Sequence, residues 1–479
     1  RGPPSPIPPA PPPRSHDEES PTKPAVESRR RAPAVPPSTP VEASSAAAGT
    51  TPPRHACGKV SISRPMDKVQ EERRELHSFC AQCWRFTCFR GSSGMVGSMA
   101  FLEKWKVFSY RTAEGTAKRL RGELTPKEWE NYVHHKLKKD ISPGPDGFQT
   151  DLIKTFSPTG LEIIRTWANQ VLTLGPQPRR ITLEQLNGTI SLLHKGTGST
   201  DRTSDWRPVV LLNTINHCVA HIINERLTNI LETSGIFESG QAGFRAFRST
   251  DSNMCKMNRV TSLAQQRKTR FFRADVDWKN AFNSMSQPAL WAMMRMLHIP
   301  DVDFLEELYE FSTVRLAPNG EREATIRFQT GVAQGSPLSP TLFLIFINTL
   351  ARLLTEVGRA ENIEHGVDGV PGFNNIFFAD DMSLFAQTEQ GLQRLLDITQ
   401  DFETWSGIKL NLKKTVMMPV GGSKPRRNEA GAVFYRGRRV PVLPEDTPCR
   451  YLGFYATANG DFKDTKDRIL QRTKELVES

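Results

Sequence analysis

Apolar and polar residues alternate with two different periods along the central part of the chain, and these periods predict its elements. Apolar residues that recur every three or four positions predict helices at about 161–174, 214–232, 280–297 and 391–405. An almost uninterrupted apolar run predicts a buried helix at 341–357. Runs rich in β-branched and aromatic residues predict strands at 189–194, 271–278 and 374–385, and from Lys409 and Arg450 onward. This mixed order of helices and strands predicts an α+β fold.

The pattern before residue 140 is also helical, from about 101 to 139. Within it, Thr125 followed by Pro126 is a capping residue with proline in the first turn, which is typical of the start of a helix. The turn-forming residues of 142–148 (SPGPDGF) end this part with a tight loop. The last twenty residues of the chain begin a further helix.

Two adjacent carboxylates, Asp380 and Asp381, interrupt the apolar strand pattern of 374–385. Side chains alternate between the two faces of a strand, so a flat, half-buried strand would place one of these charges in the core. An unpaired buried carboxylate is costly, and the tight bend of a β-hairpin avoids it. At such a bend, both carboxylates can face one side and share a cation. For this stretch alone, a solvated Asp-Asp turn is the simpler interpretation.

The strand predicted at 271–278 carries a second group of charges. Strand periodicity places Arg273, Asp275 and Asp277 on one face. The opposite, core-facing set is Phe272, Ala274, Val276 and Trp278. Carboxylates aligned toward a cleft, with apolar residues behind them, are what a platform for metal ions requires. An edge strand with a solvated face fits the same pattern.

Lys195 and Arg207 bracket a polar loop that follows the strand predicted at 189–194. Two cations on such a hairpin are able to bind a triphosphate. Two solvated surface charges are the simpler interpretation of the local pattern.

Composition narrows the class of partner. The chain has 479 residues, a net charge of +11 and a pI near 9.3, a balance that favours a polyanion such as nucleic acid. Its seven cysteines are an odd number, which argues against a secreted disulfide framework. No apolar run approaches the ~20 residues of a membrane span, so we expect no membrane partner. The first residue is Arg1, and we therefore expect the chain to be a fragment.

The N-terminal region differs in composition from the rest. Residues 1–60 are rich in Pro, Ser and Ala, and they lack the apolar surface needed to offset the entropy of ordering, so we expect disorder there. Beyond them lie His77, Cys80, Cys83 and Cys88. This cluster is a small zinc site, a Cys-rich linker with nothing bound, or a short apolar helix. Its spacing matches no common zinc module, which argues against zinc.

Eight blocks now stand in a recognisable order: SPGPDGF, DWRPVVLLN, GQAGFR, DVDWKNAFN, GVAQGSPLSP, FADD, LNLKKT and RYLG. Together they resemble the reverse transcriptases of non-LTR (LINE-type) retrotransposons. The resemblance implies a right-hand polymerase fold with fingers and palm, in which helices back an antiparallel palm sheet. It divides the chain into a disordered segment (1–60), a linker with the cysteine cluster and a helical lead-in (61–123), fingers and palm (124–460), and the start of a truncated thumb (461–479).

The resemblance also implies an activity and its metal ligands. It implies an RNA-directed DNA polymerase in which two Mg²⁺ ions promote attack of a primer 3′-hydroxyl on a dNTP. Asp277, Asp380 and Asp381 are similar to the family's three metal-binding aspartates, and Lys414 to a lysine that protonates pyrophosphate. Asp275 stands where the family is usually apolar and is a rival or helper ligand; the distance to Phe282 favours Asp277.

Further roles follow from the same resemblance. Phe282 is similar to the aromatic gate that excludes a ribose 2′-hydroxyl. The other implied nucleotide contacts are Lys195, Arg207, Gln334 and Gly335. The residues similar to the primer-steadying hairpin are Tyr451, Leu452 and Gly453. Two departures from the family pattern are Phe378, where tyrosine is usual, and Asn283, where aspartate is common.

The implied partners are an RNA template, a DNA primer or target, and dNTPs, and the implied compartment is the nucleus. The sequence does not indicate an oligomeric state. Two other functions remain open: a reverse transcriptase of the group II intron type, and a non-catalytic RNA-binding scaffold from a domesticated or decayed element.

Overall fold

The computed structural model describes residues 112–137, 142–175, 187–196, 198–202, 205–316, 324–422 and 432–478. All of them belong to one unit of the chain, Met66–Ser479. The disorder expected at 1–60 lies outside the described residues. So do His77, Cys80, Cys83 and Cys88, and with them the question of zinc.

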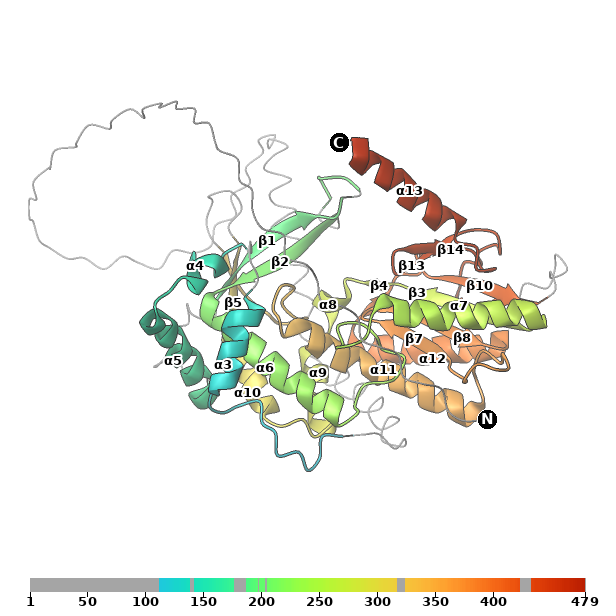
Figure 1. Cartoon of the computed structure of the whole chain (residues 1–479). Coiled ribbons are helices and arrows are strands. Elements are labelled where there is room, and N and C mark those ends of the chain that lie inside the picture. Colours follow the sequence, from blue (N-terminus) through green and yellow to red (C-terminus); the bar gives the residue numbers. More distant parts are fainter. Residues whose placement is uncertain are drawn as a thin grey trace, which may run out of the picture. The chain divides into compact units, whose positions relative to one another are not determined.

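A four-stranded antiparallel sheet, here called the palm sheet, contains the strands next to Asp277, Asp380 and Asp381 (Figure 1). Its strands, in spatial order, are β10 (Val416–Gly421), β3 (Arg270–Val276), β8 (Asp381–Ala386) and β7 (Asn375–Phe378). The helices that pack against it are α7 (Thr250–Arg267), α11 (Ser339–Glu361) and α12 (Glu389–Ser406). Ala274 packs into the cluster that contains α11 and α12, and Phe271 into the cluster that contains α7. Because neighbouring residues of a strand face opposite ways, both faces of the sheet are covered.

Helix α11 confirms the buried helix expected from the apolar run. By length and composition it is the one helix in the described part of the chain that would be able to cross a membrane. However, 89% of its apolar window is buried inside this unit. The core helix of a globular domain meets the same criteria, so α11 is weak evidence for a membrane span.

A second, mixed sheet of four strands forms the fingers sheet, in the order β2-β1-β5-β6. The strands are β1 (Gly188–His194), β2 (Trp206–Leu212), β5 (Thr313–Leu316) and β6 (Ala324–Arg327). The helices that precede or follow its strands along the chain include α4 (Thr150–Lys154), α5 (Pro158–Leu174), α6 (Thr214–Thr233) and α10 (Val302–Phe311). Strands β5 and β6 and helix α10 were not predicted. The two strands are only four residues long, too short for a clear period.

The helix expected from about 101 to 139 is wrong for most of its described part. Residues 112–125 are irregular, with Gly115 and Gly122 at positive φ, a conformation that no α-helix contains. The predicted cap is confirmed. The Thr125 hydroxyl accepts a hydrogen bond from the Glu128 N–H, and the Glu128 carboxylate accepts one from the Thr125 N–H. The helices that follow are α3 (Pro126–Asn131) and the π-helical turn η1 (Tyr132–Lys136).

Two further predictions need correction. The helix expected at 280–297 is two helices, α8 (Ala281–Ser284) and α9 (Gln287–Met296), because the Ser286 side chain caps a new helix. The strand expected at 271–278 ends at Val276. The following short pair is β4 (Trp278–Lys279) with β9 (Lys409–Leu410). The chain therefore breaks its strand at Asp277, between two different sheets.

The C-terminal part adds two small hairpins and a helix. Their elements are β11 (Phe434–Tyr435), β12 (Arg438–Arg439), β13 (Cys449–Tyr451), β14 (Phe454–Ala456) and α13 (Lys463–Glu478). The stretch from Arg450, expected as one strand, is in fact the β13–β14 hairpin. Leu452 and Gly453 form its turn with φ of 50° and 85°, the two positive values that suit a tight two-residue hairpin turn.

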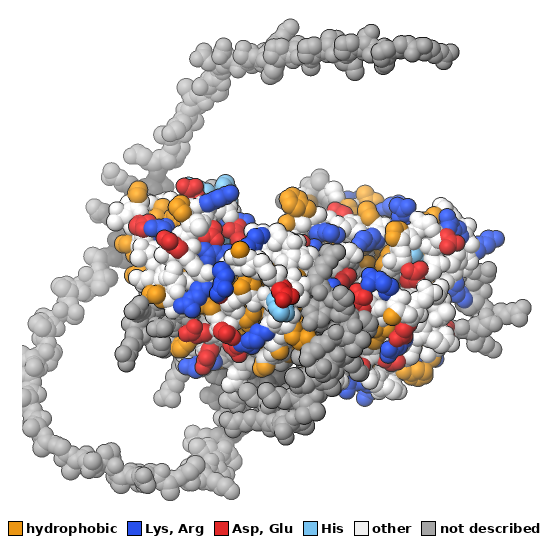
Figure 2. All heavy atoms as spheres, turned by 90° about the horizontal axis from the view of Figure 1, so that it is seen from below, with side chains coloured by type: hydrophobic (Ala, Val, Ile, Leu, Met, Phe, Trp, Pro, Cys, Tyr) orange, Lys and Arg blue, Asp and Glu red, His pale blue; other side chains and the backbone are white. Residues whose placement is uncertain are grey.

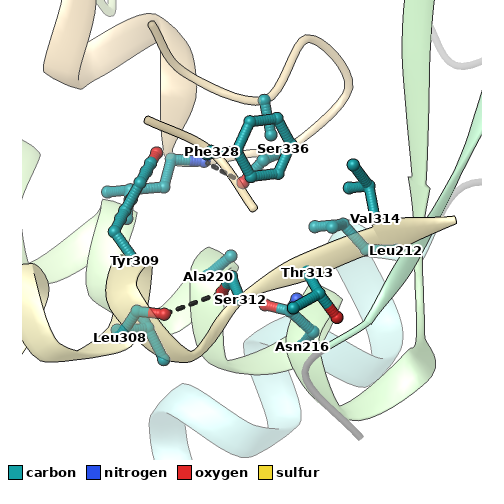
Figure 3. Close-up of a pocket in the computed structure, with 12 residues that line it drawn as sticks. Leu212, Asn216, Ala220, Leu308, Tyr309, Ser312, Thr313, Val314, Phe328 and Ser336 are labelled. Carbon is teal, nitrogen blue, oxygen red and sulfur yellow. Dashed lines mark hydrogen bonds between the residues drawn. The ribbon is translucent and has the colours of Figure 1, made fainter. Parts of the chain in front are cut away.

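A mostly apolar cavity lies between α6, α10 and the fingers sheet (Figure 3). Leu212, Val314 and Phe328 supply much of its wall. The Ser312 hydroxyl donates to the Leu308 carbonyl at 2.7 Å (Figure 3). No acidic or basic side chain lines this cavity. It therefore offers no carboxylate to bind a metal ion, and the candidate site lies elsewhere.

Candidate active site

The β7–β8 hairpin confirms the bend predicted at the two aspartates. Phe378 pairs with Asp381, which leaves Ala379 and Asp380 as the two turn residues. Ala379 has a φ of 56°. Asp380 is half-buried, and Asp381, the first residue of β8, reaches solvent. The hairpin thus presents both carboxylates at one end of the palm sheet.

Asp277 lies at the strand break beside β8 and is held by the turn 411–415. The Asn411 side-chain amide donates to Asp277 Oδ2 at 2.8 Å, and the Asn411 N–H donates to the Asp277 carbonyl at 2.7 Å. The Asp277 N–H donates to Thr415 Oγ1 at 3.3 Å. Sequence reasoning noted the LNLKKT block but missed these two supporting roles. Lys414 belongs to the same turn, and it is exposed.

The three carboxylates affect one another electrostatically. Partial loss of surrounding water raises the pKa of Asp380, and the charge of Asp277 raises it further. The pKa of Asp381 is raised to about 6, first by loss of hydration and then by the charges of Asp380 and Asp277. The Arg450 guanidinium, on β13, opposes this shift in the pKa of Asp381. The site therefore holds negative charge that its own cations compensate only in part.

Asp275 is occupied elsewhere, and the prediction that Arg273 and Asp275 face a cleft is wrong. Arg273 donates to the two carboxylate oxygens of Asp275 at 2.8 and 2.6 Å. Ser383 Oγ donates to Asp275 at 2.6 Å, and Cys449 Sγ lies 3.3 Å from it. Helix α7 and the β13–β14 hairpin cover this face of the sheet, so the pair is buried. A carboxylate with these partners has little capacity left for a metal ion.

The β13–β14 hairpin, predicted to steady a primer, is anchored on this buried pair. The Tyr451 side chain is buried, and the Arg273 guanidinium lies 5.4 Å from the centre of its ring. Burial and the charge of Asp275 raise the pKa of the Cys449 thiol to about 12, so this thiol stays protonated and able to donate. The turn residues Leu452 and Gly453 lie at the outer end of the hairpin.

The predicted nucleotide contacts lie in two parts of the structure. Phe282, Gln334 and Gly335 form the first, and the β1–β2 hairpin forms the second. Phe282, on α8, stacks on Phe343 with ring centres 4.2 Å apart, and Phe244 meets it edge-on at 6.3 Å. The Gln334 carbonyl accepts a hydrogen bond from the Val210 N–H at 2.5 Å. A Cβ atom on Gly335 would lie 2.3 Å from the Val210 carbonyl oxygen. Only glycine permits this approach, which is to strand β2 of the same chain.

Lys195 and Arg207 lie on the β1–β2 hairpin of the fingers sheet. Arg207 pairs with Leu193, and Lys195 directly follows the last pair, between His194 and Trp206. Arg207 is exposed, and Lys195 is half-buried. The hairpin-like excursion predicted between these two cations is confirmed as a hairpin. Their contact with a triphosphate stays a prediction.

The donor set fits a divalent cation in chemistry, although it is not arranged as a closed cage. Among the described residues, no group of three or more His, Cys, Asp or Glu side chains stands close enough together to hold a metal ion as placed. Carboxylate oxygens are the ligands that Mg²⁺ prefers. Loss of hydration and then neighbouring negative charge raise the pKa values of Asp380 and Asp381, and a bound cation would offset both effects. Asp277, Asp380 and Asp381 are the residues that would bind it.

Comparison with known proteins matches this part of the chain to a family. A model described as reverse transcriptase (RNA-dependent DNA polymerase) matches residues 193–456. That range covers more than half of the chain and contains every site residue from Lys195 to Gly453. Among solved structures, the telomerase of Candida tropicalis in complex with a TWJ fragment of telomeric RNA is 12% identical. It covers 67% of this chain and 53% of that one, with a TM-score of 0.41.

Two curated relatives illustrate the match. The retrovirus-related Pol polyprotein from type-2 retrotransposable element R2DM of Drosophila melanogaster is 28% identical over 325 residues, covering 67% of this chain and 29% of that protein. The RNA-directed DNA polymerase from mobile element jockey of the same species is 25% identical over 306 residues, covering 61% and 31%. The chain thus spans about a third of the length of these relatives.

Asp275→Asn tests the structural role of the buried pair. Removing the charge leaves the Arg273 guanidinium buried without its counter-ion, which should lower the free energy of unfolding by about 3 kcal/mol. Chemical denaturation of the metal-free protein measures this loss. The double variant Arg273→Met/Asp275→Leu, which removes both charges, should recover most of it. A loss below ~1 kcal/mol for Asp275→Asn would contradict the role.

Asp381→Asn tests the mutual repulsion of the carboxylates. The pKa of Asp381 in the folded protein is raised from 3.8 to about 6, so the cost of its charge to folding grows as the pH rises between these two values and is complete above about 6. At pH 8 without metal, the variant should be more stable than the wild type. Because Asp381 reaches solvent, screening limits the gain to about 1 kcal/mol, or about 2 °C in Tm.

The stability gain of Asp381→Asn over the wild type should shrink as the pH falls through about 6, where the wild-type carboxyl gains its proton. Thermal denaturation in a chelating buffer across this pH range measures it. Asp397→Asn, which removes an exposed carboxylate from α12, serves as the control. A variant that is less stable than the wild type at pH 8 would rule out net repulsion at this site.

Proposed function

Because the chain belongs to the reverse transcriptase (RNA-dependent DNA polymerase) family, we propose that it is the polymerase portion of a non-LTR retrotransposon protein. In this proposal it copies an RNA template into DNA during retrotransposition, extending a DNA primer or nicked target with dNTPs. The observation that carries the proposal is the convergence of Asp277, Asp380 and Asp381 at one end of the palm sheet, where loss of hydration and then neighbouring negative charge raise the pKa values of Asp380 and Asp381.

Each element of the site has a task in this reaction. Asp277, Asp380 and Asp381 bind the metal ions and keep them at the end of the palm sheet. Mg²⁺ held by these residues would supply Lewis-acid activation of the primer 3′-hydroxyl and charge stabilisation for the departing pyrophosphate. The turn 411–415 fixes Asp277 through two hydrogen bonds to its main chain and one to its carboxylate. Lys414, from the same turn, donates a proton to the leaving pyrophosphate.

Nucleotide selection follows from the packing around Phe282. Phe343 stacks against this ring and limits its movement, so a ribose 2′-hydroxyl would meet a fixed aromatic surface. Lys195 and Arg207, on the fingers hairpin, bind the triphosphate of the incoming nucleotide. The Gln334–Gly335 segment, hydrogen-bonded to β2, links that hairpin to the region of Phe282. The turn of β13–β14 positions the primer end.

The proposed partners agree with the charge of the chain. The net charge of +11 suits nucleic acid. Figure 2 shows basic and acidic side chains interspersed over the face that it draws, with no field of a single sign. Because this face offers no broad basic surface, we propose that the template and primer contact the chain at the site of the three aspartates. The nucleus is the compartment in which this reaction is proposed to occur.

The alternatives explain less. The curated relatives described above are named as retrotransposon proteins, which favours the non-LTR type over the group II intron type. A non-catalytic scaffold would have no need for three carboxylates at one end of the palm sheet, whose repulsion opposes folding in the absence of a cation.

Primer extension tests the proposal. The 479-residue chain should extend a DNA primer on an RNA template with dNTPs and Mg²⁺. Asp277→Asn and Asp381→Asn should each lower the rate at least about a hundredfold, since each removes a ligand for the catalytic ions. Gel analysis of the extended primer, with rates taken at saturating dNTP, measures the loss.

Asp397→Asn is the matched control and should extend at the wild-type rate. Reactions with EDTA should give no product. Extension that survives Asp277→Asn, or a wild-type chain that binds primer–template but never extends it, would refute the proposed activity.

A further inference from the structure

We propose that Gln241, buried beneath the Ala379–Asp380 turn, is a positioning residue that fixes the catalytic aspartates for metal binding. This inference rests on the proposed polymerase function. Gln241 itself does not contact substrate in this role. It acts through the backbone of the turn that carries Asp380 and begins β8 at Asp381.

The segment Gly240–Gly243, here called the strap, runs along the free edge of β7. The Phe377 N–H donates to the Gly240 carbonyl at 3.0 Å, and the Ala242 N–H donates to the Phe377 carbonyl at 2.9 Å. Gln241 and Phe377 form a parallel bridge. The strap therefore extends the palm sheet beyond β7, next to the strand that leads into the aspartate turn.

The Gln241 side chain reaches from the strap to the turn, and its residue is 0% exposed. Its carbonyl oxygen, Oε1, accepts hydrogen bonds from the Ala379 N–H at 3.0 Å and the Gly243 N–H at 2.9 Å. Its amide nitrogen, Nε2, donates to the Ala379 carbonyl at 3.4 Å. One side chain thus binds both the N–H and the C=O of Ala379.

Ala379 requires such support because of its backbone. Its φ of 56° lies in the left-handed region, which residues with a Cβ atom adopt at an energetic cost. Strained residues of this kind persist where surrounding contacts over-determine them. The two hydrogen bonds from Gln241 are contacts of this kind, and they hold the turn that aims Asp380.

Gly243 places the strap against the turn. A Cβ atom at this position would lie 2.3 Å from the Ala379 nitrogen and 2.9 Å from the Phe378 carbonyl carbon. Any larger residue would therefore push the strap off the turn and lengthen the bonds from Gln241. Glycine at this position permits the close approach of the strap to the turn.

The strap is itself fixed from behind. Arg245 donates to the Glu232 carboxylate of α6 at 2.8 and 2.7 Å. The same guanidinium donates to the Glu238 and Gln241 carbonyls at 3.0 Å each. Asn253, on α7, donates from its side chain to the Phe377 carbonyl of β7, beside the strap, at 2.9 Å. Helix α6 thus supports the strap and α7 supports the strand paired with it, which gives the turn a rigid base, as a precise catalytic site requires.

The chemistry of the contact explains why an amide is needed. The side chain must accept from an N–H and donate to a C=O of the same residue, and glutamine has both groups. Gln241→Glu keeps the acceptor but turns the donor into a second acceptor facing the Ala379 carbonyl. Gln241→Met keeps the approximate shape and loses all three side-chain hydrogen bonds, the two to Ala379 and the one from Gly243.

The test compares Gln241→Met with the wild type in primer extension and in direct metal binding. The variant should raise the Mg²⁺ concentration for half-maximal rate by about tenfold and lower kcat by a similar factor. The KM for dNTP should stay within about twofold of the wild-type value, because Gln241 does not touch the nucleotide. Mn²⁺ binding, followed by electron paramagnetic resonance without substrate, should weaken by the same factor as the Mg²⁺ dependence.

A second substitution separates positioning from general destabilisation. Glycine adopts a positive φ freely, so Ala379→Gly should let the turn form without the hydrogen bonds between Gln241 and residue 379. In that background, Gln241→Met should cost less than about threefold in metal affinity, a non-additive result. Leu227→Ala, in the buried face of α6, is the control and should lower Tm without changing the metal dependence.

The inference is overturned if Gln241→Met lowers Tm as Leu227→Ala does and leaves Mn²⁺ affinity unchanged. It is also overturned if the effects of Gln241→Met and Ala379→Gly simply add. A wild-type chain that binds Mn²⁺ but extends no primer would refute the proposed function instead. The Mn²⁺ measurements would still decide the role of Gln241.

Discussion

The repulsion between three carboxylates at one end of the palm sheet is the constraint on which the rest of the site depends. Loss of hydration raises the pKa values of Asp380 and Asp381, and the charge of Asp277 raises both further. The folded chain must therefore hold these groups together without help from their own charges. It does so through backbone geometry. The β3–β8 ladder brings the two chain segments side by side, and the turn 411–415 and the strap fix each segment from outside.

The face of β3 that α7 and the β13–β14 hairpin cover also holds charged side chains, but these form an ion pair. Arg273 and Asp275 are buried, but they neutralise each other and are hydrogen-bonded further by Ser383 and Cys449. Asp275 and Asp277 are two residues apart, yet only the second is left with uncompensated charge. The strand break after Val276 separates them, because it turns Asp277 away from the buried face and toward β9. A structural ion pair, Arg273 and Asp275, and a candidate metal ligand, Asp277, thus lie within five consecutive residues.

The sequence predicted the features that depend on local pattern, and it missed those that depend on distant partners. The hairpin at Asp380 followed from the cost of burying one charge, and the buried helix α11 from its apolar run. The orientation of Arg273 and Asp275 was wrong because a period of two does not reveal that the β13–β14 hairpin covers that face. Gln241 had no signal of its own, because its partner Ala379 lies 138 residues away. The roles of the aspartates, Lys414 and the nucleotide contacts stay predictions.

Anomalous diffraction from crystals soaked in Mn²⁺ tests the central claim most directly. The claim is that uncompensated carboxylates at the palm hairpin form the metal site of a polymerase. It predicts anomalous peaks within bonding distance of Asp277 and of at least one of Asp380 and Asp381, with none at Asp275. Peaks coordinated by Asp275, or no peak at the hairpin in crystals that bind Mn²⁺ elsewhere, would contradict it.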